Sequence, residues 1–366
     1  MSRLTILDNH LPSPAAAPWA PGLPGLQASS PGRDPAPDSR TRLIDAFGRR
    51  LTYLRVSVTD RCNLRCSYCL PEDAEFPFGD RDFLSPEEIE TVVGALVRLG
   101  IERVRLTGGE PLVRRDLLEI ARRIKSLPGV RDLALSTNGT ELARLAPALK
   151  EAGVDRVNVS LDTLDPERFH EITRRGDLPK VWEGVEAALA AGLAPVKLNA
   201  VLVSEESLAD SDRLVALTLD RPLAVRFIEM MPTATNGGAA GSVTCDAVRA
   251  RIEARYGELE PFEPEFRTGP VKAFRIPGAA GTVGFITPLS HTFCADCNRL
   301  RLTARGELRL CLFAERNYPL RHLLAEPDPE AALEAEILRL LEEKPAEHML
   351  TSGNYGNLAS FMQIGG

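Results

Sequence analysis

The sequence predicts an α/β protein whose main part is an incomplete (βα)6 barrel of the TIM type, followed by a C-terminal extension. Apolar strand patterns recur six times between residues 54 and 228. Helical patterns lie between them, and this alternation indicates a parallel sheet with helices outside it. Distinctive polar or glycine-bearing turns follow the strands, as expected where functional loops lie at the carboxyl ends of barrel strands.

The individual elements follow from hydrophobic periodicity and capping signals. Ser85-Pro86-Glu87-Glu88 is a capping box with proline at the first helical position, and it opens a helix that ends near Gly100. Further helical patterns include residues 117–125, 141–152 and 181–191. The six expected strands are residues 54–59, 103–107, 132–137, 156–160, 196–203 and 224–228.

The regions on either side of the barrel differ in composition from it. Residues 1–40 are rich in Pro, Ala, Gly and Ser without a strand or helix period, so we expect a disordered extension. Residues 41–232 form the predicted barrel, and residues 233–366 form a C-terminal region. In that region we expect helices at 246–256 and 330–343, and short strands at 271–276 and 282–286.

Composition and charge exclude several classes of protein. The chain of 366 residues has a net charge of −7, so we expect no nucleic-acid partner, and an anionic ligand needs a local cationic pocket. It has no apolar run of about 18 residues or more, so we expect no membrane partner. Seven cysteines, six of them in two tight groups, indicate metal ligation in a reducing, cytoplasmic compartment in preference to disulfides.

The first cysteine group is Cys62, Cys66 and Cys69, with spacing C-x3-C-x2-C directly after the first strand. Three thiolates on one short loop can hold three irons of a [4Fe–4S] cluster and leave the fourth iron open to an outside ligand. A zinc site or a disulfide is the alternative, although structural zinc normally takes four protein ligands.

The second cysteine group is Cys294, Cys297 and Cys311, with spacing C-x2-C-x13-C. His291 lies three residues before its first member, so a Cys3His zinc site is an alternative. Given an iron–sulfur loop elsewhere in the chain, we favour a second [4Fe–4S] cluster with an open iron. Cys245 belongs to neither group and is expected to be a small buried side chain.

Basic side chains recur in segments that are expected to line the barrel or to lie beside the second cysteine group. Arg55, Arg105 and Lys197 lie in the first, second and fifth strands, and alternation places Arg299 and Arg301 on one face of a strand. Any one of these basic side chains, taken alone, would ordinarily be interpreted as a charge on the protein surface. Together they predict a pocket for a polyanion, since a buried cation is costly without an anion and arginine forks match phosphate oxygens.

The first cysteine group, with Tyr68 before its last cysteine, resembles the signature of the radical S-adenosylmethionine (SAM) superfamily. Gly108-Gly109-Glu110-Pro111 resembles the GGEP motif of the same superfamily. The resemblance implies that the open iron binds SAM, which is then split to give a 5′-deoxyadenosyl radical. The protein's part is to position the target of that radical and to exclude side reactions.

With the second cysteine group, its Cys-Asn-Arg-Leu-Arg-Leu-Thr context and the terminal Gly-Gly, the chain resembles the molybdenum cofactor biosynthesis protein A family, the GTP 3′,8-cyclases, over residues 40–366. This resemblance implies a lyase with two [4Fe–4S] clusters held by the six cysteines. It implies that SAM contacts Tyr68, Gly109, Ser160 and Met231. It also implies that GTP contacts Arg55, Arg105, Ser136, Lys197, Arg299, Leu300 and Arg301.

The family's reaction converts GTP to (8S)-3′,8-cyclo-7,8-dihydroguanosine 5′-triphosphate, the first step of molybdenum cofactor biosynthesis. The resemblance implies a flavodoxin-like or equivalent reductant and hand-off of the product to a downstream cyclic pyranopterin monophosphate synthase, and it leaves a homodimer open. Gly365-Gly366 resembles the family tail that reaches into the active site. No residue is assigned as a catalytic acid or base. Ser136 stands where the family has threonine, so Thr137 is an alternative for that contact.

Two other functions remain open from the residues alone. One is a zinc-stabilised binding protein, and the other is a two-cluster radical SAM enzyme that acts on a peptide. The Arg-x-Arg sequence after the second cysteine pair and the terminal Gly-Gly favour a nucleotide substrate.

Overall fold

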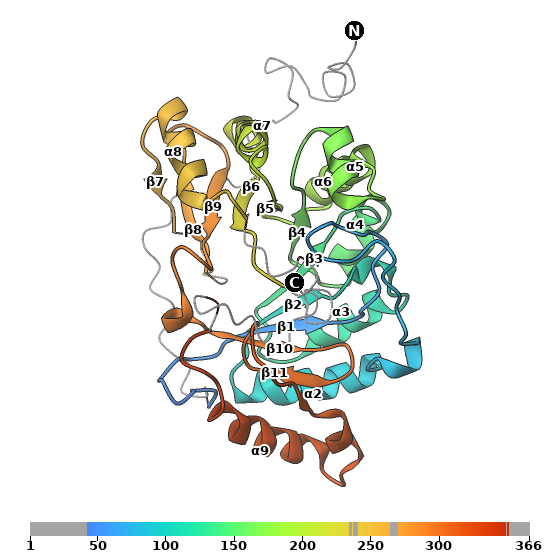
Figure 1. The fold of residues 1–366 in the computed structure, drawn as a ribbon. Coiled ribbons are helices and arrows are strands. Elements are labelled where there is room, and N and C mark those ends of the chain that lie inside the picture. Colours follow the sequence, from blue (N-terminus) through green and yellow to red (C-terminus); the bar gives the residue numbers. More distant parts are fainter. Residues whose placement is uncertain (1–41, 234–235, 237–240, 264–269, 349, 351–366) are drawn as a thin grey trace.

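The computed structural model describes residues 42–233, 236, 241–263, 270–348 and 350 (Figure 1). The extension predicted for residues 1–40 and the Gly365-Gly366 tail lie outside the described residues. None of the helices in the described part of the chain is both long and apolar enough to cross a bilayer.

Six parallel strands adjoin one another in chain order, which confirms the predicted barrel sheet. The strand boundaries lie within two residues of the predicted ranges. The strands are β1 (Tyr53–Ser57), β2 (Arg103–Thr107), β3 (Asp132–Thr137), β4 (Arg156–Ser160), β5 (Lys197–Leu202) and β6 (Ala224–Glu229).

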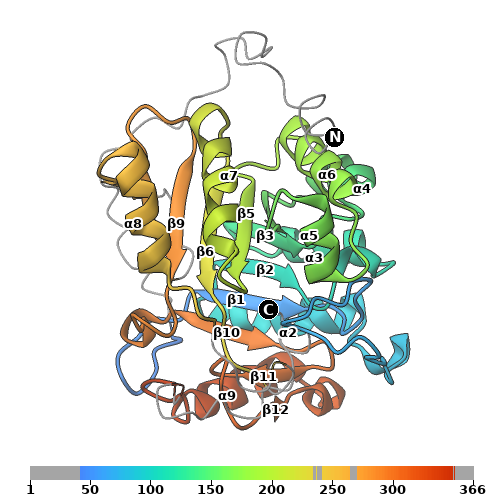
Figure 2. The same ribbon diagram turned by 45° about the horizontal axis from the view of Figure 1, so that its top comes forward.

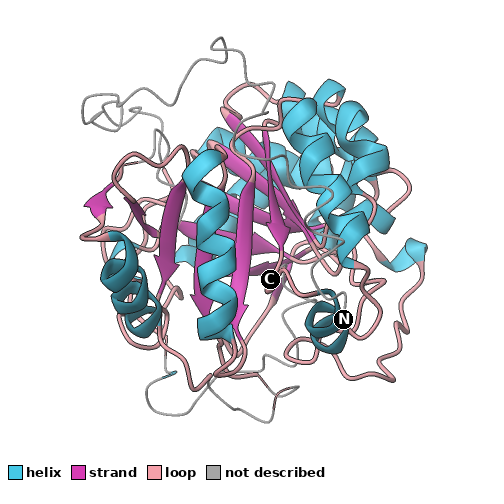
Figure 3. Ribbon diagram, turned by 90° about the horizontal axis from the view of Figure 1, so that it is seen from above, coloured by secondary structure: helices cyan, strands magenta, loops and turns pink. Residues whose placement is uncertain are grey.

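Helices follow these strands and pack on the outer side of the sheet (Figure 3). The capping box at the first of them is present: Ser85 Oγ accepts a hydrogen bond from the Glu88 amide at 3.2 Å, and Glu88 Oε2 accepts one from the Ser85 amide at 2.7 Å. Two helices, α5 and α7, were not singled out by the sequence pattern. The helices are α2 (Pro86–Leu99), α3 (Leu117–Ser126), α4 (Leu142–Glu151), α5 (Pro166–Thr173), α6 (Leu178–Ala190) and α7 (Ser207–Asp220).

The C-terminal extension is built into both edges of the sheet. Strand β9 (Thr282–Ile286) pairs in parallel with β6, and β10 (Arg299–Leu302) pairs in parallel with β1. In the described part of the chain the sheet therefore has twelve strands. Strands β6 and β9 run steeply across β1 and β10 as the sheet curls (Figure 2). The other elements of the extension are α8 (Cys245–Tyr256), β7 (Glu260–Pro261), β8 (Lys272–Arg275), β11 (Glu307–Arg309), β12 (Tyr318–Pro319) and α9 (Pro329–Leu341).

Short 3-10 turns complete the described fold. They are η1 (Asp80–Asp82), η2 (Pro111–Val113), η3 (Cys294–Asp296) and η4 (Arg321–Ala325).

The two faces of the curved sheet have opposite chemistry. Leu54 and Val56 alternate onto the outer face, where they are fully buried in the apolar core beneath the helices. The inner face instead presents a row of cations in register, with Arg301 of β10 beside Arg55 of β1, and Arg55 beside Arg105 of β2. Because gathering like charges on a buried face is costly without an anion, this inner face is where a site for an anionic ligand is expected.

Candidate active site

Both cysteine groups line one cavity of about 320 Å³ at the carboxyl ends of the barrel strands. None of the seven cysteines forms a disulfide, so the disulfide alternative is wrong. The six thiols that line this cavity are those of Cys62, Cys66, Cys69, Cys294, Cys297 and Cys311.

The first cysteine loop is fastened to the end of α5. The amide of Arg65 donates to the Thr173 carbonyl at 3.1 Å, and the amide of Ser67 donates to the Ile172 carbonyl at 2.9 Å. Burial raises the pKa of Cys62 to about 12 and that of Cys66 well above its ordinary value. A bound cation such as the iron of a cluster would oppose this effect of burial and favour the thiolate forms.

The second cysteine group has a more cationic setting. Burial alone would raise the pKa of Cys297, but Arg299 and Lys344 lower it below its ordinary value. The ring of His291, the ligand considered for a Cys3His site, instead pairs with Asp246 at 3.0 Å on the exposed surface. Among the described residues, no three His, Cys, Asp or Glu side chains gather as ligands of a single metal ion.

The four residues expected to contact SAM all line the cavity: Tyr68, Gly109, Ser160 and Met231. The two glycines of the GGEP motif lie against the backbone that leads into the cysteine loop. A Cβ on Gly109 would lie 2.3 Å from the Arg61 carbonyl oxygen, and one on Gly108 would lie 2.4 Å from that of Thr59. The two glycines therefore let β2 end directly against the backbone of the cysteine loop.

Glu110 of the same motif joins two barrel loops. It is buried, and its carboxylate accepts hydrogen bonds from the Leu112 and Asn138 amides and from Thr137 Oγ1 at 2.7 Å. Burial raises the pKa of Glu110 to about 7, although these bonds oppose the shift. Glu110 thus ties the turn after β2 to the turn after β3.

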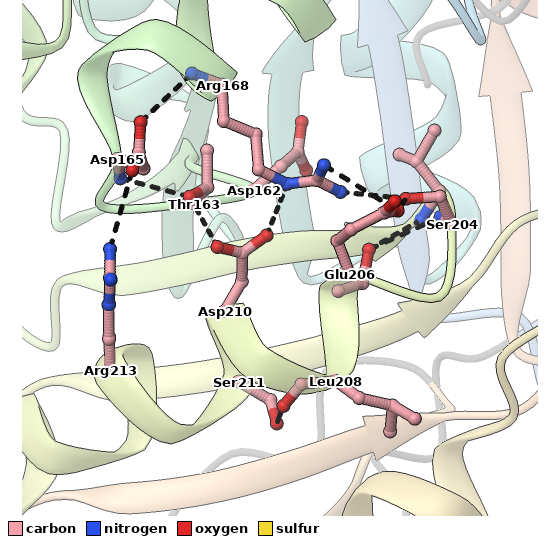
Figure 4. Close-up of polar contacts among 12 residues, drawn as sticks. Asp162, Thr163, Asp165, Arg168, Ser204, Glu206, Leu208, Asp210, Ser211 and Arg213 are labelled. Carbon is pink, nitrogen blue, oxygen red and sulfur yellow. Dashed lines mark hydrogen bonds and ion pairs between the residues drawn. The ribbon is translucent and has the colours of Figure 1, made fainter.

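Tyr68 is held by the loop that follows β4. Its hydroxyl donates to Asp162 Oδ2 at 3.0 Å, and Asp162 Oδ1 accepts from the Val201 amide at 2.8 Å. Figure 4 shows the network that supports this loop, in which Arg168 and Thr163 both reach Asp210 of α7. Asp162 therefore connects the first cysteine loop to the ends of two strands.

The arginine row forms the cationic wall of the cavity. Burial is the largest cause that lowers the pKa of Arg55, to about 10, and that of Arg301, well below its ordinary value; neighbouring arginines add to both shifts. Arg105 donates to Ser136 Oγ at 3.2 Å and to the Tyr53 hydroxyl. Like charges gathered in a buried place favour an anionic ligand.

Of the two residues considered for the threonine contact, Ser136 is the better placed. Thr137 also lines the cavity, but its hydroxyl donates to Glu110 and accepts from the Gly139 amide at 2.9 Å. Ser136 instead contacts Arg105, beside the other cations. Leu300 points to the opposite face and is fully buried in the core.

Lys197 lies at the other end of the barrel interior. It lines a second cavity of about 260 Å³, which Arg226 shares with the first. Burial is the largest cause that lowers its pKa, and Arg226 and Arg156 add to the shift. Lys197 therefore lies away from the cysteine groups, but it is close to Arg226 and Arg156, two other cations of the barrel interior.

Sequence reasoning missed several polar residues in the cavity wall. Arg226 of β6 is buried there. Among the described residues, nothing forms a hydrogen bond with the side-chain oxygens of Asn158 and Asn199 or with one guanidinium nitrogen of Arg301. The alternation that selected Arg55 and Arg105 would also have selected Arg226. Buried polar atoms without partners are characteristic of sites that receive a ligand.

Comparison with known proteins gives two family matches. Residues 56–217 match the Radical SAM superfamily, and residues 223–350 match Molybdenum Cofactor Synthesis C. A GTP 3′,8-cyclase of Pelotomaculum thermopropionicum is 48% identical over 324 residues, covering 88% of this chain and 99% of the relative. A GTP 3′,8-cyclase of Geobacter sulfurreducens is 46% identical over 329 residues, with the same coverage.

Solved structures show the same fold at low sequence identity. Streptococcus suis SuiB superposes with a TM-score of 0.53 and 14% identity, covering 83% of this chain and 68% of that chain. SuiB bound to the precursor peptide SuiA gives a TM-score of 0.54 at 14% identity, covering 83% and 67%. These likenesses confirm the predicted barrel fold.

Proposed function

The chain belongs to the GTP 3′,8-cyclase family within the radical SAM superfamily, and from this premise we propose which of its residues carry out the reaction. It is a lyase that converts GTP to (8S)-3′,8-cyclo-7,8-dihydroguanosine 5′-triphosphate, the first step of molybdenum cofactor biosynthesis. Its cofactors are SAM and two [4Fe–4S] clusters.

The observation that supports our assignment of residues is the shared cavity. Two sets of three thiols and a wall of buried arginines line the same space. GTP would fit this cavity with its purine toward the thiols of the second cysteine group and its phosphate chain toward the arginines. A zinc-stabilised binding protein would need neither the shared cavity nor the arginine row.

We assign one cysteine group to each cluster. Cys62, Cys66 and Cys69 would hold the first, and the second group of three would hold the other, because each set offers three thiols and leaves one iron free for a ligand. When bound, the first cluster and SAM supply the radical that removes hydrogen from the ribose C3′. The barrel would position C3′ and guanine C8 for ring closure.

For the substrate, we assign the phosphate chain to the cationic wall. Arg55, Arg105 and Arg301 lie in one row. Arg226 lines both this cavity and the second one, which Lys197 also lines. The guanidinium forks suit phosphate oxygens, and Ser136 adds a hydroxyl beside Arg105. We also assign Arg299 and Leu300 to the substrate site, because they lie between Cys297 and Arg301. Leu300 contributes through its backbone, because its side chain packs in the core.

The partners follow from the chemistry of the reaction. We propose a flavodoxin-like or equivalent reductant, hand-off of the product to a separate cyclic pyranopterin monophosphate synthase, and a cytoplasmic location in keeping with seven cysteines that form no disulfide. We keep the division into a barrel at 41–232 and a C-terminal region at 233–366, and we leave a homodimer open.

The function is tested by anaerobic incubation of the reconstituted protein with GTP, SAM and dithionite. We expect deoxyadenosine and the cyclised nucleotide to form together, and we expect neither without GTP. Metal analysis should give about eight irons per chain, with matching sulfide, for two clusters. Deoxyadenosine formation that does not depend on GTP, or stoichiometric zinc in place of iron, would contradict the assignment.

Replacing Asp162 with asparagine tests the support of Tyr68. The variant removes a charge-assisted hydrogen bond, so we expect SAM affinity to fall about tenfold, or about 1.4 kcal/mol, while GTP affinity stays unchanged. Equilibrium binding of each ligand measures this. Asp212→Asn is the matched control, because Asp212 pairs with Arg251 on the protein surface.

A double-mutant cycle with Tyr68→Phe shows whether the bond itself matters. If Asp162 acts through the Tyr68 hydroxyl, Asp162→Asn has little further effect once that hydroxyl is removed. Independent, fully additive effects of the two substitutions would contradict this role for Asp162.

A further inference from the structure

Lys344 is a buried lysine between two segments of the second cysteine group. Only 3% of it is exposed, and it follows α9. Its Nζ donates to the Arg299 carbonyl at 3.3 Å and to the Leu310 carbonyl. Arg299 comes two residues after Cys297, and Leu310 directly precedes Cys311. One ammonium group thus bridges the two segments that adjoin these cysteines.

Arg49 connects the residues after Lys344 to Cys294, the remaining cysteine of the second group. The guanidinium of Arg49 donates to the carbonyls of Pro345 and Ala346, both at 2.6 Å, and to the carbonyl of Cys294 at 2.9 Å. Asp45 accepts from Arg49 Nε at 2.6 Å. The segment that begins at Lys344 is therefore attached to all three parts of the second cysteine group.

Among the residues that the structure describes, the ammonium of Lys344 has carbonyl partners but no ion-paired carboxylate. Across the described part of the chain, no ion pair joins Lys344 to a carboxylate, and Asp45 is already paired with Arg49. Burial lowers the pKa of Lys344, and among its neighbours the thiols of Cys297 and Cys311 oppose that shift most strongly. A buried cation without an ion-paired carboxylate is costly, so negative charge on the cysteine side would stabilise it.

We propose that Lys344 is the charge partner of the second cluster, a positioning residue that holds the Cys297 and Cys311 segments and stabilises the cluster in its reduced state. This proposal rests on the assignment of a [4Fe–4S] cluster to that cysteine group. A cluster with three thiolate ligands is anionic, and reduction adds one more negative charge. A nearby buried cation therefore favours the reduced form and raises the reduction potential.

The test uses the full-length chain with Cys62, Cys66 and Cys69 replaced by serine, so that only the second cluster is reconstituted. In this background Lys344→Gln keeps hydrogen-bond donors but removes the charge, and Lys344→Arg keeps the charge. Lys180→Gln, at an exposed position of α6, is the matched control. The readout is the ratio of reduced to oxidised cluster by EPR at a fixed potential.

We expect Lys344→Gln to lower this ratio about tenfold, equivalent to about 59 mV for a one-electron couple, and Lys344→Arg and Lys180→Gln to leave it within about twofold. A Lys344→Gln protein that keeps its iron and an unchanged ratio overturns the proposal. If the glutamine variant loses its cluster, retention by the arginine variant supports the proposal, and loss from both overturns it. If the triple-serine parent itself binds none of the about four expected irons, the cluster assignment fails instead.

Discussion

Replacing Cys66 with alanine should abolish SAM cleavage. Two thiols remaining on the loop cannot hold the first cluster with one open iron, so deoxyadenosine formation should fall by more than about a thousandfold, a loss of about 4 kcal/mol in transition-state stabilisation. Iron should fall from about eight to about four per chain, because the second cysteine group is untouched. The measurements are iron analysis and product chromatography after anaerobic reconstitution.

Cys245→Ala is the matched control for this experiment. Cys245 is also buried, but its thiol contacts the carbonyls of Phe227 and Ile286 and lies outside both cysteine groups. The control should keep about eight irons and its activity. Full iron content in the Cys66 variant, or an equal loss of iron in the Cys245 control, would contradict the ligand assignment.

The barrel could be predicted from the sequence because its signals are local. The strands from β1 to β6 are short apolar runs, each bounded by a turn, and α2 is marked by its Ser85–Glu88 capping box. The edges of the sheet could not be predicted in the same way. The pairing of β10 with β1 joins residues about 245 positions apart, and nothing in either strand alone specifies that neighbour.

The same contrast holds within the site. Cysteine spacing and alternation located the thiols and most of the arginines, since these signals survive in a linear sequence. Lys344 and Arg49 could not be found in this way. Each is a single basic residue in a segment without a motif, and its role depends on the carbonyls that it meets after folding. The fit of Gly108 and Gly109 against the cysteine loop likewise required the folded backbone.

Replacing Arg299 and Arg301 together with alanine should mainly weaken GTP binding. Both side chains line the cavity on β10, and Arg301 lies in register with Arg55. Each charge-assisted bond to phosphate contributes about 1.5–3 kcal/mol, so the pair should cost at least about 3 kcal/mol, or more than about 100-fold in affinity. Equilibrium binding of GTP to the reconstituted protein measures the loss, and SAM affinity should change little.

Arg305→Ala separates this effect from a general loss of positive charge. Arg305 lies on the turn after β10, where it stacks on Phe78 and approaches Glu307 outside the cavity. It should bind GTP normally. Unchanged nucleotide affinity in the double variant would remove Arg299 and Arg301 from the substrate pocket.

Thermal stability gives an independent check on whether Arg301 serves the ligand or the fold. Burial and the neighbouring cations Arg55 and Arg299 lower the pKa of Arg301, so its charge opposes folding of the empty protein. Removing this charge should leave the Tm of the ligand-free protein unchanged or higher, while the stabilisation that GTP confers should shrink with the weaker affinity. A structural ion-pair partner would behave in the opposite way, with a lower Tm in the absence of GTP.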